Sequence, residues 1–131
     1  MSIGELFARA GSFFKSDEPS RKDVKAKRKR AAERTWRKVC REVDIRDDGK
    51  CRACSRRTTV AFPPTHPLSR HRHHIVFRSQ RGPDTTANVL TLCAICHADV
   101  HAHWLEIIGN ANGELRPVVL DQRAHASRQA V

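Results

Sequence analysis

The 131-residue chain carries 25 Lys and Arg against 14 Asp and Glu, a formal charge of +11 at pH 7, and 39% of its residues are hydrophobic. This composition allows one compact domain whose small core needs a further staple, and the charge favours a polyanionic partner. No stretch is long enough to span a bilayer, and the first residues do not resemble a secretory signal. We therefore expect a cytoplasmic protein with reduced thiols, which excludes membrane partners and secreted disulfide scaffolds.

The N-terminal part of the chain predicts two helices. Residues 1–19 form an amphipathic segment, because IGELFARAGSFF places apolar residues at helical spacing. Ser20 can cap the next helix, which we place at residues 20–46. The second half of this basic helix carries an apolar stripe that should anchor it, made of Trp36, Val39, Cys40 and Val43.

The first half of the basic helix is charged nearly all round. Residues 21–41 hold 11 Lys and Arg against two acids, a net charge of +9. A solvated charged face is the ordinary interpretation, but so many like charges favour phosphate, and the missing apolar face favours nucleic acid over a membrane surface. The residues expected to bind DNA are Lys27, Arg28, Lys29, Arg30, Arg34, Arg37, Arg72, Arg78 and Arg81.

Residues 47–119 predict a small α+β core. The sequence CRAC opens it with a tight turn, and prolines make the following loop irregular. LSRHRHHIVF and VLTL predict two short strands separated by a polar loop, and AICHADVHAHW predicts a helix. Residues 105–120 predict two more short strands. Residues 120–131 form a C-terminal tail in which the last ten residues are expected to fray.

Four of the five cysteines form two C-x-x-C pairs, Cys51 with Cys54 and Cys93 with Cys96. In a reduced compartment this spacing indicates metal ligands, and four thiolates complete a closed tetrahedral zinc site. Structural zinc contributes on the order of ten kcal/mol of coupled folding free energy, which suits a small core. Cys40 is expected to be an ordinary apolar residue of the helix stripe.

The histidines predict a second metal site. His97 and His101 are four residues apart on a helix, so both rings face one side, away from the cysteine pair. The adjacent residues His73 and His74 point to opposite faces of a strand, so one can complete a three-histidine site while the other is left as a base. Such a site keeps positions open for water and a phosphate oxygen.

Together these motifs resemble the HNH endonuclease family, the ββα-metal nucleases, in the subclass with a four-cysteine zinc. The resemblance rests on the two C-x-x-C pairs, HHI at 73–75, Asn88 and LCAICHADVH at 92–101, in this order, and it covers about residues 36–116. It implies a treble-clef-like ββα-metal core that holds structural Zn²⁺. The basic helix begins outside this core.

The resemblance also implies a role for each residue of the second site. His73 and His97 would bind a catalytic divalent cation, and His101 matches a third ligand of toxin-type members. His74 would be the general base that activates water, and Asn88 would brace the loop that holds His74 at the scissile phosphate. Many relatives carry Asp in place of His73, so the neutral ligand should shift the preferred ion from Mg²⁺ toward Zn²⁺, Mn²⁺ or Ni²⁺.

The implied function is metal-dependent hydrolysis of double-stranded DNA, as in free-standing HNH proteins of phage and bacterial genomes, with phage or host DNA-processing proteins as further partners. Two alternatives stay open. One is a zinc-stapled nucleic-acid-binding module that does not cleave, which the intact His73, His74, Asn88 and His97 disfavour. The other is a packaging or assembly accessory that docks through Phe7, Phe13 and Phe14.

Overall fold

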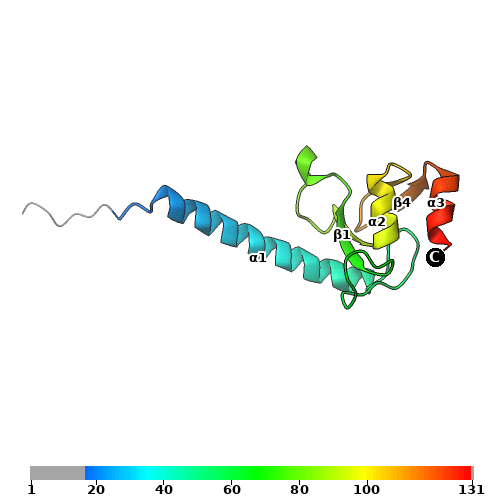
Figure 1. The fold of residues 1–131 in the computed structure, drawn as a ribbon. Coiled ribbons are helices and arrows are strands. Elements are labelled where there is room, and N and C mark those ends of the chain that lie inside the picture. The colour runs from blue at the N-terminus through cyan, green and yellow to red at the C-terminus, as the bar shows by residue number, and fades with distance from the viewer. Residues whose placement is uncertain (1–16, 131) are drawn as a thin grey trace, which may run out of the picture. The chain divides into compact units, whose positions relative to one another are not determined.

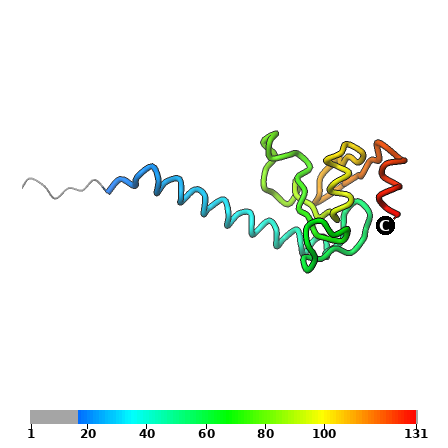
Figure 2. The backbone as a smooth tube through the Cα atoms, in the orientation of Figure 1, coloured from blue at the N-terminus to red at the C-terminus, as the bar shows by residue number. Residues whose placement is uncertain are grey.

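The computed structural model describes residues 17–130 (Figures 1 and 2). The amphipathic helix expected in residues 1–19 therefore falls outside the described residues, apart from its end. The chain divides into two compact units, Met1–Ala32 and Glu33–Val131, and helix α1 (Arg21–Asp47) belongs to both. The predicted domain boundaries stay predictions.

The start of helix α1 is capped as the sequence predicts. The Ser20 Oγ accepts a hydrogen bond from the Asp23 backbone N–H, and the Asp23 carboxylate accepts one from the Ser20 N–H, both 3.2 Å long. This reciprocal pair satisfies two of the N–H groups that a helix start leaves without partners. The basic side chains of residues 25–32 are exposed.

The part of α1 in the second unit is anchored through the predicted apolar stripe. Val39 and Val43 are buried against Val89, and Trp36 packs partly buried against them. The helix ends at Asp47 because the next residue, Asp48, adopts a positive φ of 50°, outside the helical region. The expected basic helix with an apolar C-terminal half is therefore confirmed.

The second unit contains two antiparallel hairpins and two further helices. The strands and helices, in chain order, are β1 (Arg70–His74), the one-turn 3-10 helix η2 (Arg78–Gln80), β2 (Val89–Cys93), α2 (Ala94–His101), β3 (Leu105–Gly109), β4 (Leu115–Val119) and α3 (Gln122–Gln129). Strand β1 pairs with β2, and β3 pairs with β4. Helix α2 follows β2 directly and packs against β1, β2, β3 and α3 (Figure 1).

The core lies around strand β2, whose five residues are all buried. Leu90 and Leu92 have no exposed surface, and they pack with the apolar side chains of α2 and β3, which include Ile95, Leu105 and Ile107. Because β2 leads into the first turn of α2, this core fixes the helix that carries three of the seven predicted ligands, Cys96, His97 and His101. The α+β class and the four predicted strands are confirmed, and no helix among the described residues could cross a membrane.

The helix predicted over AICHADVHAHW is shorter than expected. It ends at His101, because His103 adopts a positive φ of 59° and the Trp104 N–H donates back to the Asp99 carbonyl oxygen at 2.9 Å. A left-handed residue just after the last turn, with backbone bonds back to that turn, is a common way to end a helix. Trp104 therefore leaves α2 and leads into β3.

The expectation of a frayed C-terminus is wrong. Residues Gln122–Gln129 form helix α3, and the Asp121 carboxylate caps it by accepting the Ala124 N–H at 3.0 Å. The helix is held by polar contacts, chiefly His125, whose Nδ1 lies 2.7 Å from the buried Asp99 carboxylate of α2. A helix docked by such contacts lacks the apolar period from which helices are predicted.

Candidate functional site

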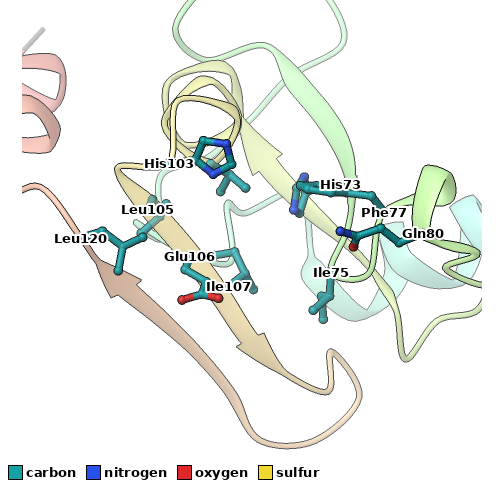
Figure 3. A pocket seen from close by; sticks show the side chains of 10 residues that line it. His73, Ile75, Phe77, Gln80, His103, Leu105, Glu106, Ile107 and Leu120 are labelled. Atoms are coloured by element: carbon teal, nitrogen blue, oxygen red, sulfur yellow. The ribbon is translucent and has the colours of Figure 1, made fainter.

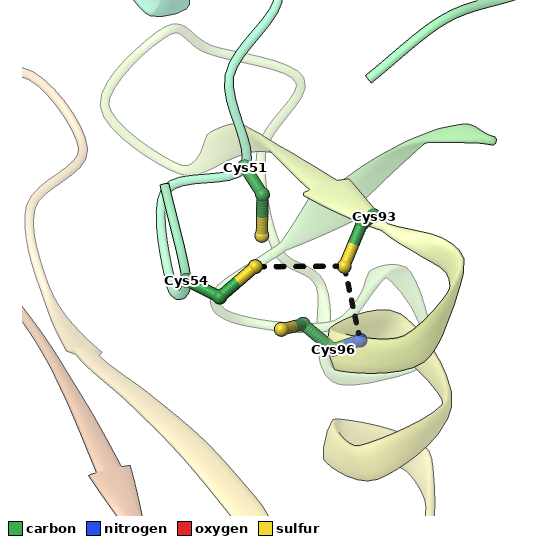
Figure 4. A group of neighbouring side chains, drawn as sticks. All are labelled: Cys51, Cys54, Cys93 and Cys96. Carbon is green, nitrogen blue, oxygen red and sulfur yellow. Dashed lines mark hydrogen bonds between the residues drawn. The ribbon is translucent and has the colours of Figure 1, made fainter. Parts of the chain in front are cut away.

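The four predicted cysteines converge from three elements (Figure 4). Cys51 and Cys54 flank a tight turn after α1, Cys93 is the last residue of β2, and Cys96 lies in the first turn of α2. Their Sγ atoms all lie within 4.8 Å of one another. Cys40 lies outside this cluster, on α1. The four cysteines form a cluster that could hold a tetrahedral zinc ion.

The electrostatics of the cysteine cluster favour a cation at its centre. Hydrogen bonds from Cys54, Cys93 and Cys96 lower the pKa of the Cys51 thiol. Contacts with Cys51 and Cys54 raise the pKa of Cys93 and Cys96, because negative charge on those two neighbours opposes further thiolates. All four can ionise together only with a compensating positive charge, and a divalent ion with soft-ligand affinity supplies it.

The three predicted histidine ligands also converge. His73 comes from β1, and His97 and His101 come from α2, with one ring nitrogen of each within 4.8 Å of the others. The Nε2 atoms of His97 and His101 are 3.3 Å apart, as expected for two rings one helical turn apart. These residues could hold a second metal ion.

Burial favours the neutral form of His73 and His97. Desolvation, followed by the charges of neighbouring histidines, lowers the pKa of His73 to about 4 and that of His97 to about 4. Both rings therefore present lone pairs at neutral pH, which is the form that ligates a metal. His101 is exposed, so one side of the cluster faces solvent. Three protein ligands with an open side suit a catalytic metal rather than a closed structural site.

His74 points away from this cluster, as strand alternation requires. Its Nε2 lies 2.7 Å from the Asp84 carboxylate, and its ring stacks on Trp36, with centroids 5.4 Å apart. The guanidinium group of Arg78 lies over the Trp36 ring, with its Cζ 4.4 Å from the ring centroid, and the Arg78 Nε donates to the Asp84 carboxylate at 3.0 Å. The sequence does not reveal Asp84 and Trp36 as neighbours of His74, because no spacing rule links either residue to it.

Asn88 joins the two sides of the loop between β1 and β2. Its Oδ1 accepts the Val76 N–H at 2.8 Å, and its Nδ2 donates to the carbonyl oxygens of Val76 and Pro83, each at 3.0 Å. The side chain is buried, so these bonds are shielded from water. This arrangement can hold the loop that carries Asp84 against the end of β1.

A further histidine and a cavity border the histidine cluster. His71 stacks on His97 with ring centroids 4.7 Å apart, a contact that the sequence does not predict. On the other side, a cavity of about 280 Å³ extends from His73 along β3. Its wall combines the apolar residues Leu105 and Ile107 with polar groups such as Glu106 (Figure 3).

The predicted DNA-binding residues fall into two groups. The side chains of the first group are exposed to solvent: Lys27, Arg28, Lys29, Arg30, Arg34, Arg37 and Arg81. The second group forms ion pairs within the protein: Arg72, whose side chain is 17% exposed, pairs with Asp44, and the exposed Arg78 pairs with Asp84. Asp44 also pairs with Arg70, so its single charge does not compensate both arginines, and DNA binding by Arg72 stays a prediction.

Comparison with known proteins places these residues in a family. Residues 51–103 match the family model described as HNH endonuclease, a range that contains both clusters, His74, Asp84 and Asn88. No curated protein and no solved structure matches the chain. The predicted HNH resemblance is confirmed over this range, and it indicates a nuclease-type enzyme.

Proposed function

We propose, from the HNH endonuclease domain at residues 51–103, that the protein is a metal-dependent endonuclease that hydrolyses phosphodiester bonds of double-stranded DNA. The observation that carries the proposal is the convergence of His73, His97 and His101 within 4.8 Å, one residue along β1 from His74. A module that only binds nucleic acid has no use for an open, three-nitrogen metal site beside a further imidazole.

The donor set decides which ion the histidine site would take. Three neutral imidazoles favour Zn²⁺, Mn²⁺ or Ni²⁺ over Mg²⁺, which prefers oxygen ligands. When bound, the ion would neutralise charge on the scissile phosphate and on the leaving oxygen. The cysteine cluster, with its closed set of four sulfur donors, would hold a structural zinc.

His74 would supply the base for the reaction. It removes a proton from water while the water oxygen bonds to phosphorus and the bond from phosphorus to the 3′-oxygen breaks. The leaving oxygen takes a proton from solvent, which gives a 3′-hydroxyl and a 5′-phosphate, and His74 then returns its proton to solvent. Asn88 would keep the β1–β2 loop, and with it the surroundings of His74, in one geometry.

The exposed cations of α1 would bind the DNA backbone. Lys27, Arg28, Lys29 and Arg30 offer four successive charges without an aromatic or amide side chain among them, which suits phosphate contacts better than base readout. DNA processing in a phage or a bacterial host is the setting that we propose for this activity.

Plasmid cleavage tests the proposal directly. Wild-type protein should cleave plasmid DNA with at least one of Mg²⁺, Mn²⁺, Ni²⁺ and Zn²⁺. The His74→Ala variant should fold and bind DNA but cleave it at least about 100-fold more slowly, because a general base contributes about that much to the rate. His103→Asn is the matched control: it removes an exposed ring without hydrogen-bond partners among the described residues, and asparagine tolerates the positive φ at this position.

The possible outcomes separate the candidate functions. A His74→Ala variant that cleaves at the wild-type rate would contradict the assigned mechanism. A wild-type protein that binds DNA but cleaves with none of the four ions would instead identify a zinc-stapled binding module.

A further inference from the structure

The ring of His74 is held by the loop that precedes β2. Its Nε2 lies 2.7 Å from the Asp84 Oδ1, and the His74 side chain is 10% exposed. Asp84 also lies 3.0 Å from the Arg78 Nε, so this carboxylate has two partners. Nothing in the C-x-x-C or histidine spacing points to Asp84, which lies ten residues from His74 along the chain.

The charge on Asp84 decides which nitrogen of His74 carries the proton. Burial raises the pKa of Asp84, but hydrogen bonds from His74 and Arg78 outweigh this effect and leave the pKa below its usual value. Asp84 is therefore ionised at neutral pH, and a carboxylate only accepts hydrogen bonds. The His74 Nε2 must donate, and a neutral imidazole with a proton on Nε2 has its lone pair on Nδ1.

We propose that Asp84 is a positioning residue that holds His74 as the Nε2–H tautomer and thereby makes Nδ1 the atom that takes the proton from water. This inference rests on the proposed endonuclease function and on the short contact between the two side chains. Asp84 touches neither water nor phosphate in this scheme; it acts through His74 alone.

Trp36 and Arg78 restrict the ring further. The His74 ring lies nearly parallel to that of Trp36, at 15°, with centroids 5.4 Å apart. Arg78 bridges the two supports, because it lies over Trp36 and also pairs with Asp84. A half-turn of the imidazole would put a carbon where Nε2 lies and break the bond to Asp84. The stack and the carboxylate together therefore select one orientation and one tautomer.

The backbone of the loop fixes where Asp84 lies. A Cβ on Gly82 would come within 1.7 Å of the Val76 carbonyl oxygen, so only glycine allows this close approach. One residue before Asp84, the Pro83 carbonyl oxygen accepts a hydrogen bond from Asn88 at 3.0 Å. The loop is thus tied to the β1–β2 hairpin just before the position that carries the carboxylate.

Nitrogen NMR of the imidazole rings tests the tautomer without any cleavage reaction. In wild-type protein loaded with Zn²⁺, at about pH 8.5, where a free imidazole is neutral, the His74 Nδ1 should resonate as an unprotonated nitrogen and Nε2 as a protonated one. His74→Gln identifies the signals. Asp84→Asn should populate the other tautomer, because an amide can donate to Nε2. A protonated Nδ1 in wild-type protein would overturn the proposal.

Cleavage kinetics on a labelled DNA duplex with saturating Mn²⁺ test the functional consequence. Asp84→Asn should lower kcat by about 10²-fold or more and leave KM within about twofold, as when other orienting carboxylates are removed. Asp84→Glu should recover part of kcat. Asp48→Asn, which alters an exposed carboxylate, is the matched control and should leave both constants unchanged.

A double variant shows whether Asp84 acts through His74. In the His74→Ala background, Asp84→Asn should cause no further loss, because the group that it positions is gone. A further loss of similar size, or an Asp84→Asn single variant with the wild-type kcat, would overturn the positioning role while the endonuclease function stands. Wild-type protein that never cleaves DNA would instead refute the function on which the inference rests.

Discussion

Two adjacent residues of β1 show how a strand separates two chemical roles. His73 is 3% exposed and belongs to the histidine cluster with α2, whereas His74 stacks on Trp36 and meets Asp84. The alternation of side chains along a strand gives each ring its own environment. The same two imidazoles in a loop could both turn toward one ion, and no base would be reserved.

Loss of one histidine ligand should weaken binding of the second metal ion. His97→Ala removes one of three nitrogen ligands, so the affinity for Mn²⁺ should fall by at least about 10- to 100-fold, the loss usual for groups that only support a ligand. Calorimetry on protein that holds one zinc per chain measures this affinity. His97→Ala should still hold the structural zinc of the cysteine cluster, because that cluster is separate from His97. His103→Asn should bind Mn²⁺ like the wild type. Equal Mn²⁺ affinity in His97→Ala would exclude the histidine cluster as the metal site.

Helix α2 contributes residues to the cysteine cluster, to the histidine cluster and to the contact with α3. Cys96 belongs to the cysteine cluster, His97 and His101 to the histidine cluster, and Asp99 pairs with His125 of α3. The end of α1 is tied to the same core by Asp47, whose buried carboxylate accepts hydrogen bonds from the Thr91 N–H of β2 and from two arginines. Polar contacts therefore help to hold α1 on β2 and α3 on α2.

Loss of the Asp47 charge should destabilise the junction between α1 and β2. Burial raises its pKa, but hydrogen bonds from Arg46, Arg52 and the Thr91 N–H outweigh burial and leave the pKa below its usual value. Asp47→Asn should lower the free energy of unfolding by about 2–3 kcal/mol, less than for a fully buried pair because both arginines are partly exposed. The measurement is denaturant unfolding of zinc-loaded protein.

The pH dependence of this loss follows from the sign of the pKa shift. A carboxylate with a depressed folded pKa stabilises fully above the unfolded value of about 3.9 and loses its effect only as the pH falls through that region. The loss in Asp47→Asn should therefore be equal at about pH 6 and about pH 8. Asp48→Asn, on the exposed neighbour, should change stability by less than about 0.5 kcal/mol. A loss confined to one of the two pH values would contradict this account.

For the whole molecule, the cysteine cluster joins the end of α1, strand β2 and helix α2. Cys51→Ser should lose the structural zinc and, with it, most of the folding free energy, because coordination of this kind contributes on the order of ten kcal/mol. Elemental analysis and thermal unfolding measure both effects. Cys40→Ser is the internal control, since Cys40 lies outside the cluster. If Cys51→Ser kept its full zinc content and an unchanged Tm, the four cysteines would not form a structural zinc site that stabilises the fold.

The charge of the whole molecule predicts how DNA binding responds to salt. Replacing Lys27, Arg28, Lys29 and Arg30 by Gln should weaken binding about equally for all sequences and lower the salt-dependence slope by about one for each phosphate that the variant no longer neutralises. Fluorescence anisotropy at several salt concentrations measures both effects. Replacing the exposed residues Arg116 and Arg123 by Gln tests whether loss of positive charge elsewhere weakens DNA binding as much as loss of charge on α1. Weaker binding of particular sequences only would indicate base readout instead.

The features whose signal is local could be predicted from the amino-acid sequence. The capped basic helix with its apolar end, the two C-x-x-C pairs, the H-x-x-x-H spacing of α2 and the four short strands all follow from side-chain periods and ligand spacings within a few residues. These sufficed to predict both clusters and the HNH resemblance.

The surroundings of those ligands emerge only in the folded protein. Trp36 and Asp84 meet His74 from separate parts of the chain, Arg72 pairs with Asp44, and His125 docks an unpredicted helix on Asp99. Such pairs carry no period and no fixed spacing, because each side chain finds its partner only after the core around β2 has brought distant segments together. The ligand residues are therefore readable from the chain, whereas the groups that orient and neutralise them depend on the packed fold.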